Sequence, residues 1–130
     1  MIPTIESCLV CDFVRPELNG KLIILGFFGI CPNVDVAISQ LDQPTALTFV
    51  FSGTSGEGLI DLQFDVLDEV ESRVVASTSP QAFQASPKAT VLAPTLLLVF
   101  GHAGRFAVRC HMNGSERFRA HFAVSQGASK

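Results

Sequence analysis

The sequence predicts an all-β fold, a single antiparallel β-sandwich of about eight strands, and three observations lead to that prediction. The chain has 130 residues, which fits one domain over residues 1–130. Apolar residues make up 48% of it and charged residues 16%, a balance that supports a folded core and excludes disorder. Apolar and polar residues alternate with the period of two that is typical of strands, between recurring turn residues. A closed barrel is the alternative arrangement.

In the first half of the chain, turn residues separate four predicted strands. Pro16 and Asn19-Gly20 punctuate a turn over residues 15–20, a Cys31-Pro32-Asn33 break follows, and Asp42-Gln43-Pro44 is a second break. Glycine-rich residues 53–58 form the next connection. The strands predicted between these signals cover residues 5–14, 21–30, 45–52 and 59–67.

In the second half, four more strands are expected, over residues 73–77, 89–100, 105–112 and 116–124, the second of them bent near Pro94. Residues 79–87 are expected to form a loop, and residues 125–130 a frayed tail. Val66, Val70 and Val74 also have helical spacing, so residues 66–77 are either a hairpin that turns at Asp68-Glu69 or a short helix. The strand-rich surroundings favour the hairpin.

The second predicted strand is apolar on both of its faces over residues 22–28. An antiparallel sandwich usually leaves one face of each strand polar. We therefore expect this strand to be central and covered on both faces, by a lid from residues 78–94 or by the second subunit of a homodimer.

Charge is distributed unevenly: eleven of the twelve acidic residues precede residue 73, and seven of the nine basic residues follow residue 72. In the last predicted hairpin the even positions are apolar on both strands. With a three-residue loop at Asn113-Gly114-Ser115, Arg109 would face Arg119 and His111 would face Arg117. The other face then carries the candidate binding surface, which we call the Arg/His face: Arg105, Arg109, His111, Arg117, Arg119 and His121.

Like charges opposite one another destabilise a sheet, so the Arg/His face needs an anionic counterpart. The first candidate is the neighbouring strand at residues 59–67, whose outward row contains Asp61 and Asp65. The second is a partner surface, either a second copy or an acidic protein. The third is an anionic ligand or nucleic acid. The net charge of −3 and the absence of Tyr and Trp for base stacking argue against nucleic acid.

Metal-site patterns are weak. Cys8 and Cys11 have a zinc-like spacing, but on a strand they point to opposite faces, and no second pair follows. Both are interpreted as small buried hydrophobes. His111 and His121 lie beside arginines that would repel a cation, and His102 is interpreted as a turn residue between glycines. The sequence therefore predicts no metal site and no cofactor.

Carboxylates offer two further alternatives. Asp12 interrupts an apolar strand. We expect its carboxylate to accept hydrogen bonds from turn amides or from Arg15, and the alternative is that Asp12 belongs to a functional site. A calcium site is the alternative for the acids between Asp61 and Glu71, although they lack the spacing of an EF-hand loop. No nucleophile, phosphate-loop or metalloprotease motif is present, so no catalytic residue is expected.

No basic leader precedes the first apolar stretch, and the longest apolar runs are too short for a membrane-spanning helix. A cytoplasmic protein without a membrane partner is expected. Its four cysteines should then be reduced.

The N-terminal residues resemble the opening of a family of small bacterial proteins of unknown function. The residues that carry the resemblance are Cys11-Asp12-Phe13, then Gly20-Lys21-Leu22, three apolar residues and Gly26. Gly104-Arg105-Phe106 and Asn113-Gly114 are similar to the closing hairpin of that family and of many immunoglobulin-like sandwiches. The resemblance implies an immunoglobulin-like β-sandwich and brings no assigned activity.

Together these observations predict a non-enzymatic binding or protein-interaction module. Its expected partner is a second copy or an acidic protein surface. A sandwich that binds a small molecule or a calcium ion is the alternative.

Overall fold

Residues 1–127 are described by a computed structural model, and they form two packed β-sheets that contain eleven strands. One sheet, sheet A, has the order β2-β1-β4-β8, with β9 also paired to β4. All of its pairings are antiparallel. Its strands are β1 (Ile5–Pro16), β2 (Leu22–Ile30), β4 (Pro44–Gly53), β8 (Thr90–Leu92) and β9 (Thr95–Val99).

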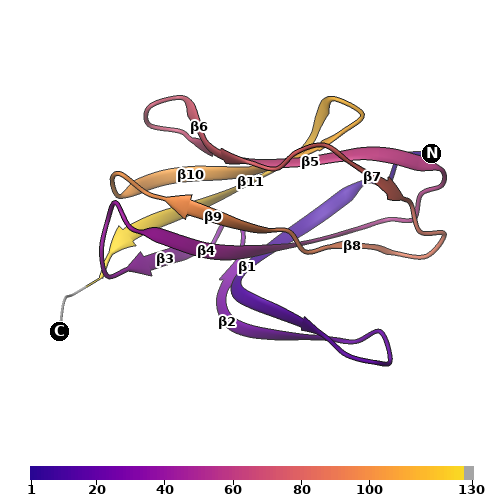
Figure 1. Ribbon diagram of the computed structural model, residues 1–130, viewed down its shortest axis with the longest axis horizontal. Helices are drawn as coiled ribbons and strands as arrows, with labels where there is room; N and C mark the ends of the chain where they lie inside the picture. The colour runs from indigo at the N-terminus through magenta and orange to yellow at the C-terminus, as the bar shows by residue number, and fades with distance from the viewer. Residues whose placement is uncertain (128–130) are drawn as a thin grey trace.

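The other sheet, sheet B, has the order β3-β11-β10-β5-β6, with β7 also paired to β5. Figure 1 shows it above sheet A, with the hairpin of β1 and β2 projecting below. Its strands are β3 (Asp35–Ile38), β5 (Leu59–Asp68), β6 (Arg73–Ser77), β7 (Gln81–Gln84), β10 (Gly104–Met112) and β11 (Ser115–Gln126).

The all-β prediction is therefore confirmed, and the sheets do not close into a barrel. Three differences raise the strand count above eight. β3 was not expected, β7 lies inside the expected loop, and the strand expected over residues 89–100 is divided into β8 and β9. The division falls at Pro94, which has no backbone N–H to donate to a ladder.

The expectation of purely antiparallel pairing is wrong at one place, because β3 lies parallel to β11. After β2, the chain crosses from sheet A to the free edge of β11, and it arrives there in the same direction as β11. The same pairing shows that the expectation of a frayed tail from residue 125 onward is wrong. Ser125 and Gln126 belong to β11 and lie opposite Ala37 and Ile38. Gly127 N–H donates to the Ile38 carbonyl oxygen at 2.7 Å, and the last three residues of the expected tail, 128–130, lie outside the described residues.

Residues 66–77 form the predicted hairpin, with β5 antiparallel to β6. The turn lies a little later than expected, and Ser72 adopts the left-handed conformation within it. No helix in the described part of the chain is long and apolar enough to cross a membrane.

The core lies between the sheets and is rich in phenylalanine. Phe49 of β4 packs on Phe122 of β11, with ring centroids 5.5 Å apart, and Phe51 of β4 stacks on Phe64 of β5 at 5.3 Å. The even positions of β10 are buried, as the alternating pattern predicted. Aromatic pairs of this kind add to the stabilisation that burial of apolar area provides.

Candidate functional site

The Arg/His face lies on the outer side of sheet B, where β10 pairs with β11. Arg109 lies opposite Arg119, as predicted. The prediction that His111 faces Arg117 is wrong, because His111 lies opposite Glu116. The loop has two residues, Asn113 and Gly114, both at positive φ. On the β10 side of this loop, the pairing register shifts between Cys110 and His111. Asn-Gly favours this short turn, whereas the prediction assumed a loop of three residues.

Asp65 of β5 neutralises the centre of the Arg/His face. It lies opposite Arg109 in the β5–β10 ladder, and its side chain is only 10% exposed. Arg109 donates two hydrogen bonds to its carboxylate, at 2.6 and 2.8 Å, and His111 Nε2 lies 3.1 Å from Oδ2. The neighbouring strand therefore supplies the anionic counterpart of Arg109 and His111, which was the first of the three candidates.

Two further acids pair with two of the remaining four members of the face. Glu116 accepts hydrogen bonds from Arg119 at 2.8 and 3.2 Å, and this contact holds the pKa of Glu116 below its usual value. His121 Nδ1 lies 2.7 Å from Glu69 Oε1. Among residues 1–127, no ion pair involves Arg105 or Arg117, and both are exposed. Arg105 and Arg117 therefore carry the unpaired positive charge that is left on this face.

The sequence reasoning missed an ion pair between His102 and Asp68. Asp68 is 1% exposed, and its Oδ1 accepts the backbone N–H groups of Val70 and Glu71 at 3.0 and 3.1 Å. His102 Nε2 lies 2.6 Å from Asp68 Oδ2, and Nδ1 lies 2.8 Å from the carbonyl oxygen of Ala103. Because both ring nitrogens face acceptors, the imidazolium form satisfies both contacts.

The pKa values of this pair follow from the same contacts. Burial opposes ionisation of Asp68, but the bonds from Glu71, His102 and Val70 together lower its pKa. The bond to Ala103, followed by the bond to Asp68, raises the pKa of His102. The two residues are far apart in the chain, and only the β5–β10 ladder, which places Phe106 opposite Asp68, brings the loop of His102 beside the turn.

Asp68, Glu71 and His102 also form the one group of three or more potential metal-ligating side chains among residues 1–127 whose ligand atoms all lie within 4.8 Å of one another. Calcium prefers oxygen ligands, whereas this group offers an imidazole nitrogen. Both oxygens of Asp68 already accept hydrogen bonds within the protein. We therefore interpret Asp68 as the acceptor that closes the β5–β6 turn.

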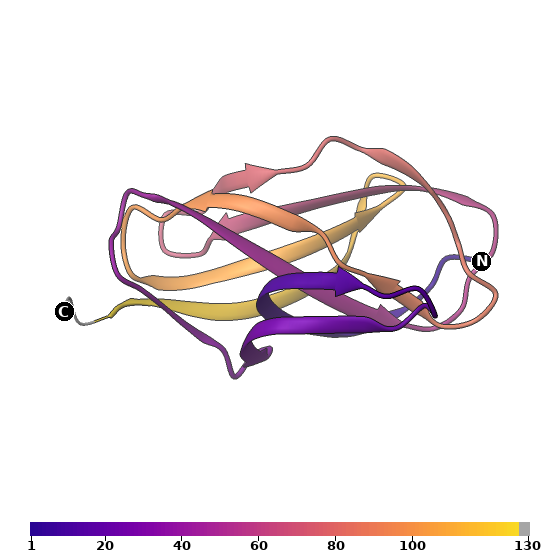
Figure 2. The same ribbon diagram turned by 60° about the horizontal axis from the view of Figure 1, so that its bottom comes forward.

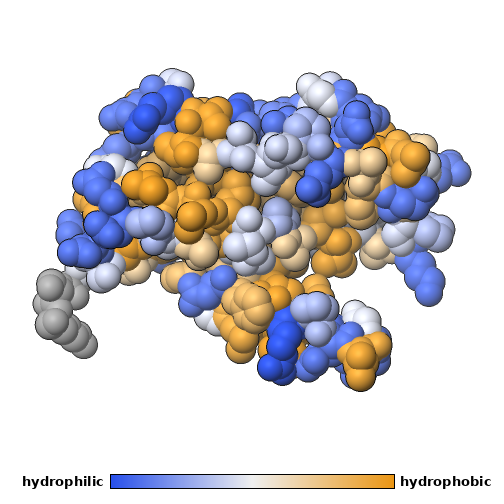
Figure 3. All heavy atoms as spheres, in the orientation of Figure 1, coloured by the Kyte–Doolittle hydropathy of each residue, from blue (hydrophilic) through white to orange (hydrophobic). Residues whose placement is uncertain are grey.

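The hairpin of β1 and β2 is the most apolar exposed part of the molecule. The region beyond the register shift at Val10/Cys11, residues 12–27, is called the arm below. Figure 2 shows it in front of the sheets, extending away from them. One of its faces exposes Phe13 (50%), Leu25 (44%) and Phe27 (58%), and the other exposes Leu22 (40%) and Ile24 (38%). Figure 3 shows the arm projecting below the body, with hydrophobic atoms exposed among hydrophilic ones.

β2 is an edge strand of sheet A, contrary to the expectation of a central strand covered on both faces. The predicted lid is also wrong, because residues 78–94 contribute β7 to sheet B and β8 to sheet A instead. The register shift in β1 turns the arm out of the sandwich, and bulges commonly bend strands in this way. The apolar pattern is thus left exposed.

Asp12 lies on the arm rather than at a buried position. It is exposed, and its main-chain oxygen accepts a hydrogen bond from the Thr48 hydroxyl at 3.3 Å. Its carboxylate lies against Gly26, at positive φ, where an added Cβ would overlap it. The expected bond to Arg15 is absent from the described residues, since Arg15 pairs with Glu17. An exposed carboxylate is solvated by water and needs no protein partner, so the structural prediction for Asp12 is corrected.

A cavity of about 390 Å³ opens at the edge of the two sheets where both edge strands are interrupted. β6 gives way to β7 on one side of it, and β8 gives way to β9 on the other. Apolar residues line it together with a few polar groups, and the lining comprises Leu62, Phe64, Thr78, Gln81, Val91, Leu92, Ala93, Pro94 and Thr95.

Comparisons with known proteins give no family. No family model matches the chain, and no curated protein matches it. Among solved structures, the alkylpurine DNA glycosylase AlkC of Pseudomonas fluorescens, bound to DNA with an abasic site analogue, is similar with a TM-score of 0.47 and 14% identity. The similarity covers 70% of this chain and 28% of that chain.

Proposed function

We propose that this protein is a non-enzymatic protein-interaction module that forms a homodimer through the arm. The observation that carries the proposal is the exposure of apolar side chains on both faces of one projecting hairpin. Soluble domains rarely keep such surfaces in water, and contiguous patches of this kind mark interaction sites.

A second copy is the partner that best fits an edge strand. Within residues 1–127, the outer backbone groups of β2 have no neighbouring strand, because sheet A ends there. Two β2 strands related by a two-fold axis can pair antiparallel, and each copy then supplies the same donors and acceptors to the other. Apolar side chains on both faces of the two arms would become covered in the same step.

The Arg/His face is the second proposed surface, for an acidic protein. Asp65, Glu116 and Glu69 already bind four of its six members, so Arg105 and Arg117 are the members that remain for a partner. A double substitution of these two residues tests this surface. Substituting Arg109 would instead leave Asp65 buried without its main partner.

The homodimer is tested by native mass spectrometry and by light scattering after size exclusion, over the micromolar range. We expect a dimer for the natural chain and a monomer for the triple variant Phe13→Thr, Leu25→Thr and Phe27→Thr. Threonine keeps the β propensity of these positions and removes most of their apolar area.

The matched control is Leu59→Thr with Val74→Thr, which removes exposed apolar area from β5 and β6. This control should remain a dimer. A natural chain that is monomeric throughout the range would overturn the homodimer, and so would a triple variant that dimerises as well as the control does.

The cavity of about 390 Å³ favours a small-molecule site as the second candidate function. Its size lies within the usual range for ligand pockets, and it combines apolar walls with Thr78, Gln81 and Thr95. The probe 8-anilinonaphthalene-1-sulfonate should bind with increased fluorescence, and Ala93→Phe should abolish that increase. Equal fluorescence from the Ala93→Phe variant would exclude this cavity.

We also infer a cytoplasmic protein of the small bacterial family that its opening hairpin resembles, with an immunoglobulin-like sandwich. The resemblance in residues 11–26 supports the family, and the two packed sheets are consistent with such a sandwich.

A further inference from the structure

Two of the four free cysteines, Cys8 and Cys31, lie opposite one another at the base of the arm. Leu9 pairs with Ile30 in the β1–β2 ladder, and the next position of each strand is Cys8 and Cys31. The backbone N–H of Cys31 donates to the carbonyl oxygen of Cys8 at 2.9 Å, so the ladder continues through this pair. We propose that these two residues are a peroxide-sensitive dithiol, in which Cys31 reacts with the peroxide and Cys8 then closes a disulfide.

The backbone spacing suits a disulfide. Directly opposed residues in a hydrogen-bonded antiparallel pair have Cα atoms about 5.5 Å apart. Disulfides span Cα distances of about 4.4–6.8 Å. The bridge therefore requires rotation of the side chains and no movement of the strands.

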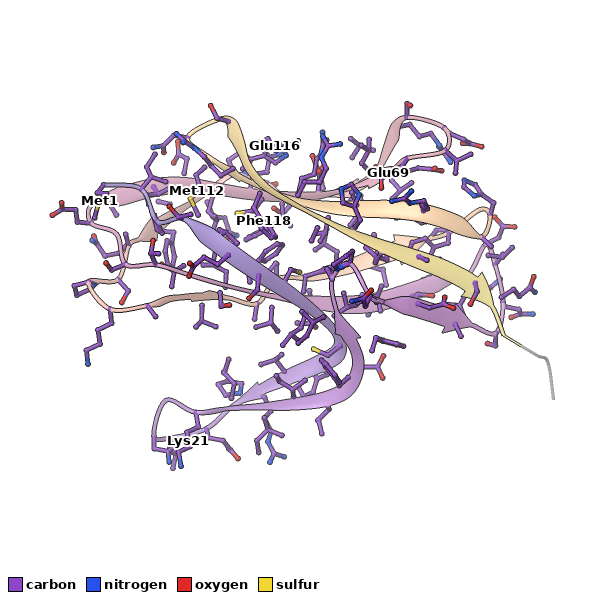
Figure 4. The ribbon with its side chains drawn as sticks, turned by 180° about the vertical axis from the view of Figure 1, so that it is seen from behind. Met1, Lys21, Glu69, Met112, Glu116 and Phe118 are labelled. Carbon is purple, nitrogen blue, oxygen red and sulfur yellow. The ribbon has the colours of Figure 1, made fainter. Side chains whose placement is uncertain are left out.

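The two thiols differ in access to solvent. Cys8 is 1% exposed and belongs to the core, where its Sγ lies 3.6 Å from the Leu9 carbonyl oxygen. Cys31 is partly exposed and lines a hollow of about 180 Å³ together with Pro32, Phe118, Arg119, Ala120 and His121. Figure 4 labels Phe118, one of the β11 residues that line this hollow. A small peroxide can reach Cys31 through it, whereas Cys8 lies behind.

The two thiols also differ in acidity. A hydrogen bond from the Cys8 thiol, together with the backbone N–H of Cys31, lowers the pKa of Cys31 despite its partial burial. The same hydrogen bond and its own burial raise the pKa of Cys8. The thiolate, which is the reactive nucleophile, is therefore favoured at the more accessible sulfur.

The chemistry balances with hydrogen peroxide as the oxidant. The Cys31 thiolate attacks one peroxide oxygen, an S–O bond forms, the O–O bond breaks, and the leaving hydroxide takes up a proton to become water. The Cys8 thiol then attacks the sulfenic sulfur, the S–S bond forms, and the S–O bond breaks with release of a second water. Two thiols lose two electrons and two hydrogens, and the peroxide is reduced to two waters.

The other two cysteines provide matched controls. Cys11 lies beyond the register shift, where its Sγ is 3.7 Å from the Thr48 carbonyl oxygen, and burial raises its pKa. Burial raises the pKa of Cys110 to about 12. Both are 0% exposed, so neither should react with peroxide while the protein is folded.

The test treats the reduced, full-length protein with hydrogen peroxide and then maps its disulfides by trypsin digestion and mass spectrometry. Cleavage after Lys21 separates Cys8 and Cys11 from Cys31, and cleavage after Arg109 separates Cys110 from the rest. We expect one disulfide, which joins the peptide of Cys8 to the peptide of Cys31, with the loss of two hydrogens from the intact mass.

Single variants then assign the partners. Cys11→Ser and Cys110→Ala should form the same disulfide as the natural chain, whereas Cys31→Ser should form none. Cys8→Ala should stop at a Cys31 sulfenic acid that dimedone traps, and Cys8→Ser provides the same measurement if the alanine variant folds poorly. A peroxide-treated chain that keeps four thiols would overturn the proposal, as would a disulfide that includes Cys11 or Cys110.

Discussion

The arm and the Arg/His face occupy opposite sides of the molecule. The arm exposes apolar side chains, whereas the Arg/His face carries charged and titratable ones. In Figure 4, Lys21 marks the tip of the arm, while Glu69 and Glu116 mark the charged side. The Arg/His face is conspicuous in the sequence, yet Asp65, Glu116 and Glu69 neutralise most of its charge within the chain. The arm is built from ordinary apolar strand residues, yet nothing in the described residues covers it.

This comparison separates two kinds of surface. A cluster of like charges implies only that counter-charges exist, and in a sheet the neighbouring strand is the closest place for them. The apolar residues of the arm are not covered by neighbouring strands in this way, because the arm points away from the two sheets that would otherwise cover them. The arm is therefore the stronger candidate for intermolecular contact.

The largest expected effect comes from breaking the charged network. Arg109→Met leaves Asp65 nearly buried with only His111 beside it, and we expect a loss of about 2–3 kcal/mol in the free energy of unfolding. Urea unfolding followed by circular dichroism measures this loss. Arg117→Met is the control, and it should change stability by less than about 0.5 kcal/mol. Equal stability of the two variants would mean that the Asp65 network contributes nothing.

A smaller effect is expected from glycine substitution in the arm. Gly26→Ala places a methyl group on the Asp12 carboxylate at a residue with φ of +67°, so both a clash and backbone strain oppose it. We expect a loss of about 1–2 kcal/mol. Gly20→Ala has a similar φ with open space around it and should show the strain alone.

The double variant Gly26→Ala with Asp12→Ala separates the two contributions. It should recover the part of the loss that the overlap with the Asp12 carboxyl group causes, as measured by the same unfolding experiment, whereas the Asp12 Cβ, 2.8 Å from the added methyl group, remains in place. No recovery would show that Asp12 does not restrict this position.

The smallest effect is a dependence of stability on pH from the His102–Asp68 pair. The pKa of His102 is raised in the folded state, so its contribution is complete below pH 6.5 and is lost as pH rises through the raised value. The pKa of Asp68 is lowered, so its contribution is complete above pH 3.8 and is lost as pH falls through the lowered value.

Thermal unfolding of the natural chain and of His102→Gln between pH 6 and pH 9 tests the loss of the His102 contribution as pH rises. The difference in melting temperature should shrink as pH rises, because the natural chain loses the charged contact and glutamine does not titrate. A difference that stays constant over this range would exclude a charged His102 as its source.

By itself, the sequence determined the all-β class, the approximate limits of seven of the eight predicted strands and the buried rows of the last hairpin. These features follow from alternation with a period of two and from turn residues, which are local properties of the chain. The opposition of Arg109 and Arg119 was also predicted, because the apolar rows of the two strands must share a face. The turn does not account for it: the two-residue turn places His111 opposite Glu116, and the register shift between Cys110 and His111 then brings Arg109 opposite Arg119.

Only the tertiary structure decided what covers each strand. β3 and β7 are short edge strands held by neighbours distant in sequence, so no local pattern distinguishes them from loops. The exposure of the arm results from one register shift in β1, and the meeting of His102 with Asp68 results from the pairing of β5 with β10. Alternation shows which side chains share a face, but the packing of distant strands decides whether that face meets protein or water.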